Sequence, residues 1–142
     1  MTTTTPNDDV AVLDPPECWE LLRQAEVGRL AVMVGSTPDI FPINFLVDHG
    51  TVVFRTAAGT KLAGAVLGRV VAFESDGWDL ERGEAWSVVV KGHAREIEQL
   101  HEYLDALDLP LFPWVASPKP RFVRIEPDSI TGRRFRVVRR EA

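Results

Sequence analysis

Short apolar runs separated by turn-forming residues are the feature of this sequence that most constrains its fold. In the run 29–34, apolar side chains point alternately to two sides, which is the period of a β-strand. Residues with turn chemistry at 36–39 and 48–50 separate the next runs and predict hairpin connections. Strands are predicted at 29–34, 40–47, 52–56, 70–73, 86–97 and 121–125, with a last strand at 133–138.

Three short segments change to helical spacing. Asp14 followed by two prolines is typical of a helix cap and first turn, and predicts a helix over about 16–25. Two further helices are predicted over about 60–67 and 100–107. Because these helices are inserted among antiparallel strands and do not alternate with them, the pattern favours a mainly β fold with a closed or nearly closed β-barrel.

The length of 142 residues predicts one domain, because cores usually divide only beyond about 250 residues. Residues 1–13 are interpreted as a disordered lead-in without the features of a signal peptide, and residues 14–142 as the folded domain. Cys18 is the single cysteine, so no disulfide can form within the chain. With no apolar run near the ~20 residues that span a bilayer, we expect a cytoplasmic protein that does not bind membranes.

The charge of the chain argues against nucleic-acid binding. Its formal net charge of −5 repels a phosphate backbone on average. Five arginines between 133 and 140 form a local basic cluster, but no aromatic interleaving or recognised motif accompanies them. We interpret this cluster as a solvated strand and tail.

The segment 54–62 combines a strand end, a turn of small residues and a helix start. Arg55 and Lys61 supply two cations, and Thr56 and Thr60 supply two hydroxyls. A helix start offers free backbone N–H groups and a partial positive charge, so this segment is a candidate anion site, most readily for a phosphate. It lacks the spacing of a Walker loop or a dinucleotide fingerprint, and a capped surface helix with solvated cations is the alternative.

Four blocks in fixed order carry a resemblance to a known family. They are Pro42-Ile43-Asn44-Phe45, residues 53–61, residues 71–74 and residues 86–94. Together, over about residues 21–134, they resemble the pyridoxamine 5′-phosphate oxidase-like flavoproteins. The resemblance implies a six-stranded antiparallel split β-barrel that binds FMN, usually as a homodimer with the cofactor at the interface.

The resemblance also assigns residues to the cofactor. It implies that the segment 42–45 lies along the flavin ring, and that an indole and a hydroxyl near the start of 86–97 touch the flavin. For the indole, a core aromatic is the equal alternative. The implied cofactor-binding residues are Pro42, Ile43, Asn44, Arg55, Thr56, Thr60, Lys61, Trp86 and Ser87.

The sequence contains no recognisable catalytic pair or metal site. His49, His93 and His101 lack metal-ligand spacing, so no metal is expected and the catalytic residues stay unknown. Phe112 and Trp114 lie in a proline-rich loop and are interpreted as anchors of that loop, with a roof over the flavin as the alternative.

The function implied by the resemblance is that of an FMN-dependent oxidoreductase. The chain is shorter than pyridoxamine phosphate oxidases and lacks their C-terminal Arg-Leu-His segment, which argues against vitamin oxidation. We expect reduction of a small electrophilic or aromatic substrate with electrons from a reduced nicotinamide. A deazaflavin-dependent reductase and a flavin- or haem-binding module with little turnover are the alternatives.

Overall fold

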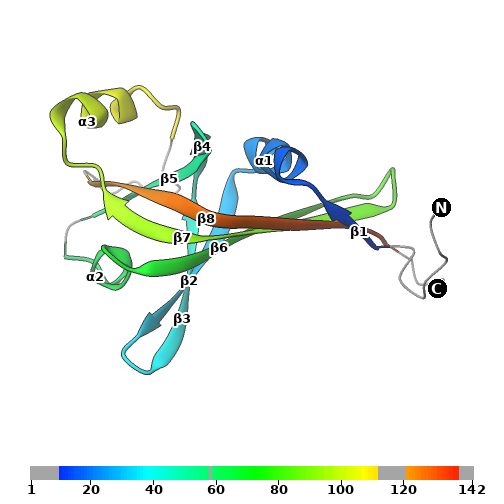
Figure 1. The fold of residues 1–142 in the computed structure, drawn as a ribbon, viewed down its shortest axis with the longest axis horizontal. Helices are drawn as coiled ribbons and strands as arrows, with labels where there is room; N and C mark the ends of the chain where they lie inside the picture. The colour runs from blue at the N-terminus through cyan, green and yellow to red at the C-terminus, as the bar shows by residue number, and fades with distance from the viewer. Residues whose placement is uncertain (1–9, 58, 112–120, 138–142) are drawn as a thin grey trace.

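The computed structural model describes residues 10–57, 59–111 and 121–137. Within these ranges one antiparallel sheet curls around the main core and three helices lie against it (Figure 1). The strands are β1 (Val10–Leu13), β2 (Val27–Val34), β3 (Thr37–Asn44), β4 (Leu46–Asp48), β5 (Thr51–Thr56), β6 (Val70–Asp79), β7 (Glu84–Glu96) and β8 (Arg121–Arg136). The helices are α1 (Pro15–Gln24), α2 (Lys61–Val66) and α3 (Leu100–Leu107).

The sheet is split and does not close by hydrogen bonds. Its order is β3-β2-β6-β7-β8-β5-β4, and β1 pairs with β8 outside this path. The end strand β3 contacts β5, but no ladder joins these two strands in the described part of the chain. The structure confirms the split-barrel fold class, with eight described strands where the family resemblance implies six.

The main core lies inside the curl of the sheet and beneath α1. The aromatic rings of Phe45 and Phe73 meet edge to face with centroids 4.7 Å apart. Cys18 and Leu22 of α1 are fully buried against this core. Close approach of the helix requires a glycine on β8, because a Cβ atom at Gly132 would lie 2.6 Å from Cys18 Sγ. Asp14 caps α1 by accepting the Glu17 N–H at 3.0 Å, as predicted.

A smaller core lies on the other face of β5 and β8, beneath α3. It contains Val53, Ile97, Ala106, Leu111 and Phe122. The ring of Tyr103 packs edge to face on Phe122 at 5.5 Å. None of the helices within the described ranges is long and apolar enough to cross a membrane.

Two strand boundaries differ from the sequence prediction at the ends of the domain. Val10–Leu13, predicted within the lead-in, form β1 and pair with residues 132–135 of β8. The predicted strands 121–125 and 133–138 are one continuous strand, β8. Pairing with β7 between residues 123 and 136 holds β8 extended, and the register shifts at Lys91/Gly92, where Pro127 lies opposite Gly92.

Two further corrections concern hairpins. The predicted run 40–47 divides into β3 and β4 at Phe45, whose buried ring joins the core. The predicted turn from Asp76 to Glu84 is mostly strand, because β6 continues to Asp79 and β7 begins at Glu84.

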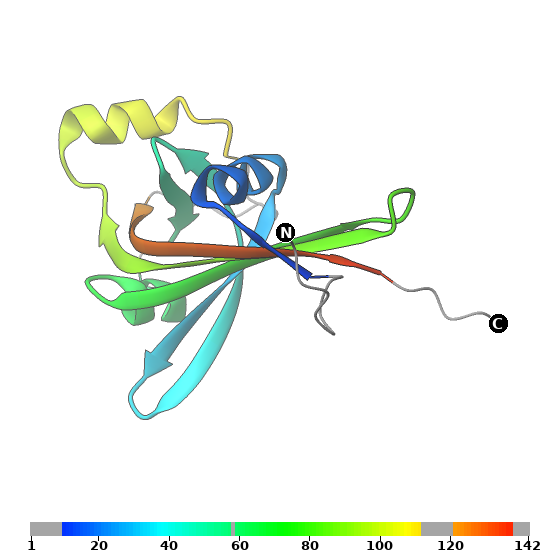
Figure 2. The ribbon, with the colours of Figure 1, turned by 45° about the vertical axis from the view of Figure 1, so that its right-hand side comes forward.

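The extended hairpin forms a projection that we call the arm, defined as residues 76–87 together with residues 133–137. It leaves the barrel as a ribbon of β6, β7 and β8, with β1 paired along the outer side of β8, and it reaches well beyond α1 (Figures 1 and 2). Residues of the arm pair in continuous rows across β6, β7 and β8.

Candidate functional site

The turn between β5 and α2 holds two of the predicted site hydroxyls in contact. Thr60 caps α2: its hydroxyl oxygen accepts the Ala63 N–H at 3.1 Å, and the hydroxyl donates to the Ala57 carbonyl at 2.8 Å. Since Thr60 has one hydroxyl proton, the buried Thr56 hydroxyl is the donor in the 3.1 Å contact between the two threonines. The Thr60 hydroxyl is therefore fully engaged within the turn.

Lys61 is the exposed cation of this turn. Its side chain is 71% exposed, and Nζ lies 2.9 Å from Asp39 Oδ2 on β3. The hydrogen bond from Lys61 holds the pKa of Asp39 below its usual value. This ion pair places the start of α2 beside β3, so two parts of the predicted site lie on the same side of the molecule.

Arg55 lies on a different face from these residues. Its guanidinium carbon is 4.8 Å from the centroid of the Phe122 ring, in the smaller core beneath α3. Adjacent residues of a strand point to opposite faces, and Thr56 points into the other side of β5. The structure thus brings Thr56, Thr60 and Lys61 together and places Arg55 on the opposite face of β5.

The predicted ring-binding segment is the end of β3. Ile43 is buried in the main core, whereas Pro42 is exposed. The Asn44 side-chain amide donates to the Glu26 carbonyl at 3.5 Å. Because β3 is an end strand, its outer edge pairs with no other described strand and leaves backbone groups accessible to a ligand.

Trp86 and Ser87 lie on the arm, away from the β5–α2 turn of the same chain. Trp86 pairs with Arg134, whereas Glu96, ten residues further along β7, pairs with Val123 next to β5. At the strand rise this separation is roughly 30 Å. The Trp86 indole packs on Gly77, where a Cβ atom would lie 2.7 Å from the indole nitrogen Nε1. This packing corresponds to the core alternative for Trp86, and its contact with a flavin stays a prediction.

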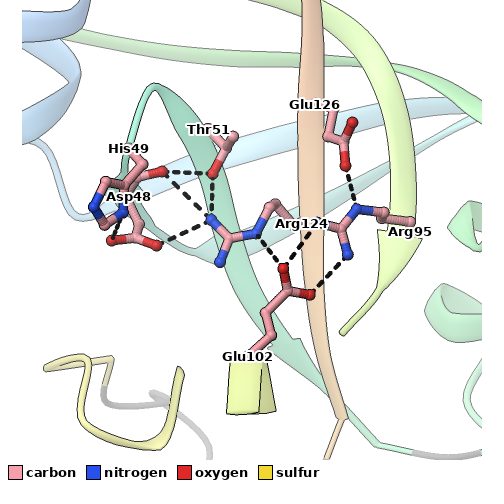
Figure 3. A network of polar contacts seen from close by, with 7 residues as sticks. All are labelled: Asp48, His49, Thr51, Arg95, Glu102, Arg124 and Glu126. Atoms are coloured by element: carbon pink, nitrogen blue, oxygen red, sulfur yellow. Dashed lines mark hydrogen bonds and ion pairs between the residues drawn. The ribbon is translucent and has the colours of Figure 1, made fainter. Parts of the chain in front are cut away.

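A polar network that the sequence analysis does not predict joins β4, β5, β7, β8 and α3 (Figure 3). The side chain of Arg124 is only 11% exposed, and Nη1 donates to Asp48 Oδ2 at 3.0 Å and to Thr51 Oγ1 at 2.7 Å. Glu102 receives two hydrogen bonds from Arg95, at 2.8 and 3.0 Å, and Arg95 also pairs with Glu126. These partners are up to 76 residues apart, and so no local pattern reveals them.

The network shifts the acidity of its carboxyl groups. Burial raises the pKa of Asp48, but hydrogen bonds from Arg124 and His49 outweigh burial and leave the pKa below its usual value. Hydrogen bonding from Arg95 lowers the pKa of Glu102. Both carboxylates are thus held ionised, and their hydrogen bonds to Arg124 and Arg95 link α3 and the strands.

The histidines lie outside the β5–α2 turn. His49 Nδ1 is 3.0 Å from Asp48, and His93 Nδ1 is 3.1 Å from the exposed Asp128. His101 lines a cavity of about 520 Å³ beside the polar network. In the part of the chain that the structure describes, no group of His, Cys, Asp and Glu has the arrangement of a metal site. Phe112 and Trp114 fall outside the described residues.

The chain resembles known proteins along most of its length. A protein of Mycobacterium tuberculosis, the uncharacterized Rv0080, is 38% identical over 135 residues, which is 89% of this chain and 86% of its own. The FAD binding protein of Mycobacterium smegmatis is 42% identical, with a TM-score of 0.79 over 88% of this chain and 98% of its own. A Corynebacterium glutamicum protein, whose name assigns it to the pyridoxamine 5′-phosphate oxidases, is 39% identical, with a TM-score of 0.84 over 96% of this chain and all of its own. The model of the family described as pyridoxamine 5′-phosphate oxidase matches residues 14–134, and the chain belongs to that family.

Proposed function

We propose that this protein is a flavin-dependent oxidoreductase that holds the phosphate of FMN at the β5–α2 turn. The observation that carries the proposal is the position of Lys61, which brings an exposed cation and the start of α2 to the unpaired edge of β3. A cation and a helix start together stabilise a phosphate, and an open strand edge offers hydrogen bonds to a polar ring. The 42% identical protein named as an FAD binding protein supports a flavin as the cofactor.

Gly59 and Lys61 leave a phosphate access to the turn, whereas Thr60 and Arg55 must first give up contacts that they already make. Gly59 has a φ of 74° and open space around its Cβ position, so a ligand can approach the backbone there. Lys61 can exchange Asp39 for a phosphate, because its side chain is largely exposed. Thr60 can donate to a phosphate only by releasing the Ala57 carbonyl, and Arg55 only by leaving the Phe122 ring.

The bound flavin would supply the electron or hydride transfer, and the protein would orient it and exclude water. In this proposal Lys61 holds the phosphate together with Thr56 and Thr60, whose hydroxyls must first release Thr60 Oγ1 and the Ala57 carbonyl. Pro42, Ile43 and Asn44 lie along the ring. The substrate is a small electrophilic or aromatic molecule, and a reduced nicotinamide supplies the electrons. No described residue is assigned as a catalytic acid or base.

FAD is the second candidate cofactor, because the 42% identical protein of Mycobacterium smegmatis is named as an FAD binding protein. FAD contains the same riboflavin phosphate as FMN, so a site of this kind can accept either molecule. A deazaflavin cofactor in the same groove is the remaining alternative, and we propose FMN ahead of both.

We also propose that two copies of the chain form the complete site. Within one chain the β5–α2 turn and Trp86–Ser87 are separated along β7, so one flavin can meet both only if a second copy supplies the arm. The outer face of the sheet supports such an association, since Ile40 on β3 and Val70 on β6 are 65% and 64% exposed.

The decisive experiment is an absorbance spectrum of the purified protein, before and after addition of FMN, FAD or a deazaflavin and removal of free ligand by desalting. We expect a flavin spectrum to persist with FMN, and reduced nicotinamide to be consumed when an electrophilic acceptor is present. Retention of a deazaflavin alone would replace the cofactor, and a retained flavin without turnover would favour a binding module. A protein that retains none of the three contradicts the proposal.

A further inference from the structure

Helix α3 exposes a row of leucines to solvent, which we call the leucine row. Leu100, Leu104 and Leu107 are spaced by four and three residues, so their side chains share one face of the helix. Their exposed fractions are 72%, 51% and 48%. The helix packs on the smaller core through Ala106 and Tyr103, and no other described helix or strand covers its outer side (Figures 1 and 2). The leucine row is therefore an apolar face without a partner in the described part of the chain.

The charges at the end of α3 oppose the stability of the free helix. Asp105 lies in the last turn and Asp108 is the C-cap, where the helix dipole is negative, and the last turn holds no basic residue. Both residues are exposed, and neither carboxylate forms an ion pair with another residue of the described ranges. At the other end, Gln99 makes no side-chain capping hydrogen bond. The two carboxylates thus cost the free protein stability, and a cation supplied from outside would relieve that cost.

An acidic recess adjoins the leucine row. It is the cavity of about 520 Å³ between α3 and the β4–β5 turn, and its charged or titratable lining residues are Asp48, His49, His101, Glu102, Asp105, Asp108 and Arg124. Carboxylates outnumber the guanidinium group in this lining by four to one. Asp48 and Glu102 already accept hydrogen bonds from arginines of the polar network, which leaves the two carboxylates of α3 for an added cation. Asp108 follows Leu104 by about one turn, so the recess and the leucine row lie side by side on the helix.

This combination of surfaces fits a partner of one chemistry. The leucine row needs an apolar surface to cover it, and the recess beside it needs a positive charge. An anionic membrane or a nucleic acid would be repelled by the carboxylates and by the net charge of −5. The leucine row is roughly 10 Å long, which two turns of a second helix match. Such a helix would place its own apolar side chains at three- and four-residue spacing.

We propose that the leucine row and the acidic recess form a docking surface for a basic amphipathic helix of a partner protein. The apolar side chains of that helix cover Leu100, Leu104 and Leu107, and one of its lysines or arginines enters the recess beside Asp105 and Asp108. None of these residues is assigned to the flavin, so the proposal goes beyond the flavin function and does not depend on it. Apolar burial supplies the affinity, and the charges select a cationic partner.

The proposal is tested by calorimetric titration of the purified protein with a synthetic amphipathic helix made of leucine and lysine, and with the same helix carrying glutamate in place of lysine. We expect one site per chain for the lysine peptide and no binding of the glutamate peptide, because like charges repel. Leu104→Gln should weaken the lysine peptide by at least about tenfold, because an apolar contact is lost. Leu80→Gln on the arm, where the leucine is 58% exposed, is the matched control and should change the affinity by less than about twofold. Leu100→Gln is a second variant of the leucine row should Leu104→Gln fail to fold.

The charge is tested by replacing Asp105 and Asp108 together with asparagine. This double variant should bind the lysine peptide about five- to tenfold more weakly. It should also resist urea better than the wild-type protein, because the repulsion at the end of α3 is removed. Glu20→Gln combined with Glu81→Gln removes the same net charge from exposed positions on α1 and the arm, and is the matched control. Equal losses of affinity in the two double variants would show attraction to net charge alone and would overturn the docking surface.

Other occupants of the leucine row are distinguished by the same proteins. If the lysine peptide fails to bind and Leu104→Gln changes the oligomeric state in sedimentation velocity, the leucine row is a contact between copies and the proposal is refuted. If the peptide binds only after Trp114→Ser, residues 112–120 of the same chain occupy the leucine row, which also refutes it. Peptide binding that neither Leu104→Gln nor the Asp105 and Asp108 double variant weakens would place the peptide elsewhere and overturn the proposal. Retention of FMN is measured without the peptide, so failure of the flavin proposal is seen independently.

Discussion

Lys61 is the residue on which phosphate recognition is proposed to depend. Replacing it with alanine should weaken FMN binding by about 10- to 100-fold, because one charge-assisted hydrogen bond to the phosphate is lost. Riboflavin, which lacks the phosphate, should lose less than about twofold by the same reasoning. Equilibrium dialysis of both ligands checks this, with Arg23→Ala on α1 as an exposed cationic control. Equal losses for FMN and riboflavin would remove Lys61 from the phosphate site.

Gly132 sets the distance between α1 and β8. A Cβ atom there would meet Cys18 Sγ at 2.6 Å and the Ser87 carbonyl at 3.2 Å, so Gly132→Ala should lower the free energy of unfolding by about 1–3 kcal/mol. Gly64 in α2 has nothing within 4 Å of its Cβ position, so Gly64→Ala should be neutral or stabilising by up to about 1 kcal/mol. Urea denaturation of both variants measures the difference. Similar stabilities would mean that α1 moves freely on β8.

Part of the arrangement of the β5–α2 turn could be predicted from the sequence. Thr56, Thr60 and Lys61 are close in the chain, so their meeting could be predicted from the strand-to-helix change alone. The separation of Arg55 follows from the two-residue period of a strand, but its stacking on Phe122 does not, because Phe122 lies on a distant strand. The engagement of the Thr60 hydroxyl needs atomic positions.

The polar network links α3 to the sheet and makes the free energy of unfolding depend on pH. The folded pKa of Asp48 is below its ordinary value, so its contribution is complete above about pH 4 and is lost as the pH falls towards the folded pKa. Asp48→Asn should cost about 1–3 kcal/mol at pH 7, because Arg124 loses its ionised partner. The cost should shrink as the pH falls through the folded pKa of Asp48, because the wild-type carboxyl then becomes protonated as well.

This prediction is checked by urea denaturation of both proteins between pH 7 and pH 2. Asp128→Asn is the matched control, because Asp128 is 62% exposed and, among the described residues, forms an ion pair only with the exposed His93. A cost for Asp48→Asn that is the same at every pH would show that packing, not charge, explains it.

Helices and strands could be predicted where the residues that define them are close together in the sequence. The cap and prolines of α1 define its start in the sequence, and the runs of β2, β5 and β7 follow the strand period. The union of two predicted strands into β8 was not predictable, because its middle is held by pairing with β7 and contains Pro127 and Gly132. The polar network was equally hidden, since sequence spacing carries no signal for partners on separate elements.

At the scale of the whole molecule, the proposed dimer explains why the site residues divide between the barrel and the arm. Val70 is 64% exposed on the outer face of the sheet, and a buried charge there would cost several kcal/mol in an interface. Val70→Asp should therefore shift the protein from dimer to monomer in sedimentation velocity and lower the retention of FMN. Leu104→Asp on α3, where the leucine is 51% exposed, is the control and should stay dimeric. A dimer unaffected by Val70→Asp would place the interface elsewhere.

The open edge of β3 has a further consequence for how the protein behaves at high concentration. Unpaired edges invite strands of other chains and lead to aggregation, but Pro38 and Pro42 have no N–H to offer along this edge. Between them, the Ile40 N–H is already donated to Asp39 Oδ1 at 2.9 Å. The edge can accept hydrogen bonds from a small molecule. It cannot also donate them at regular intervals, as the β-ladder of a fibril requires.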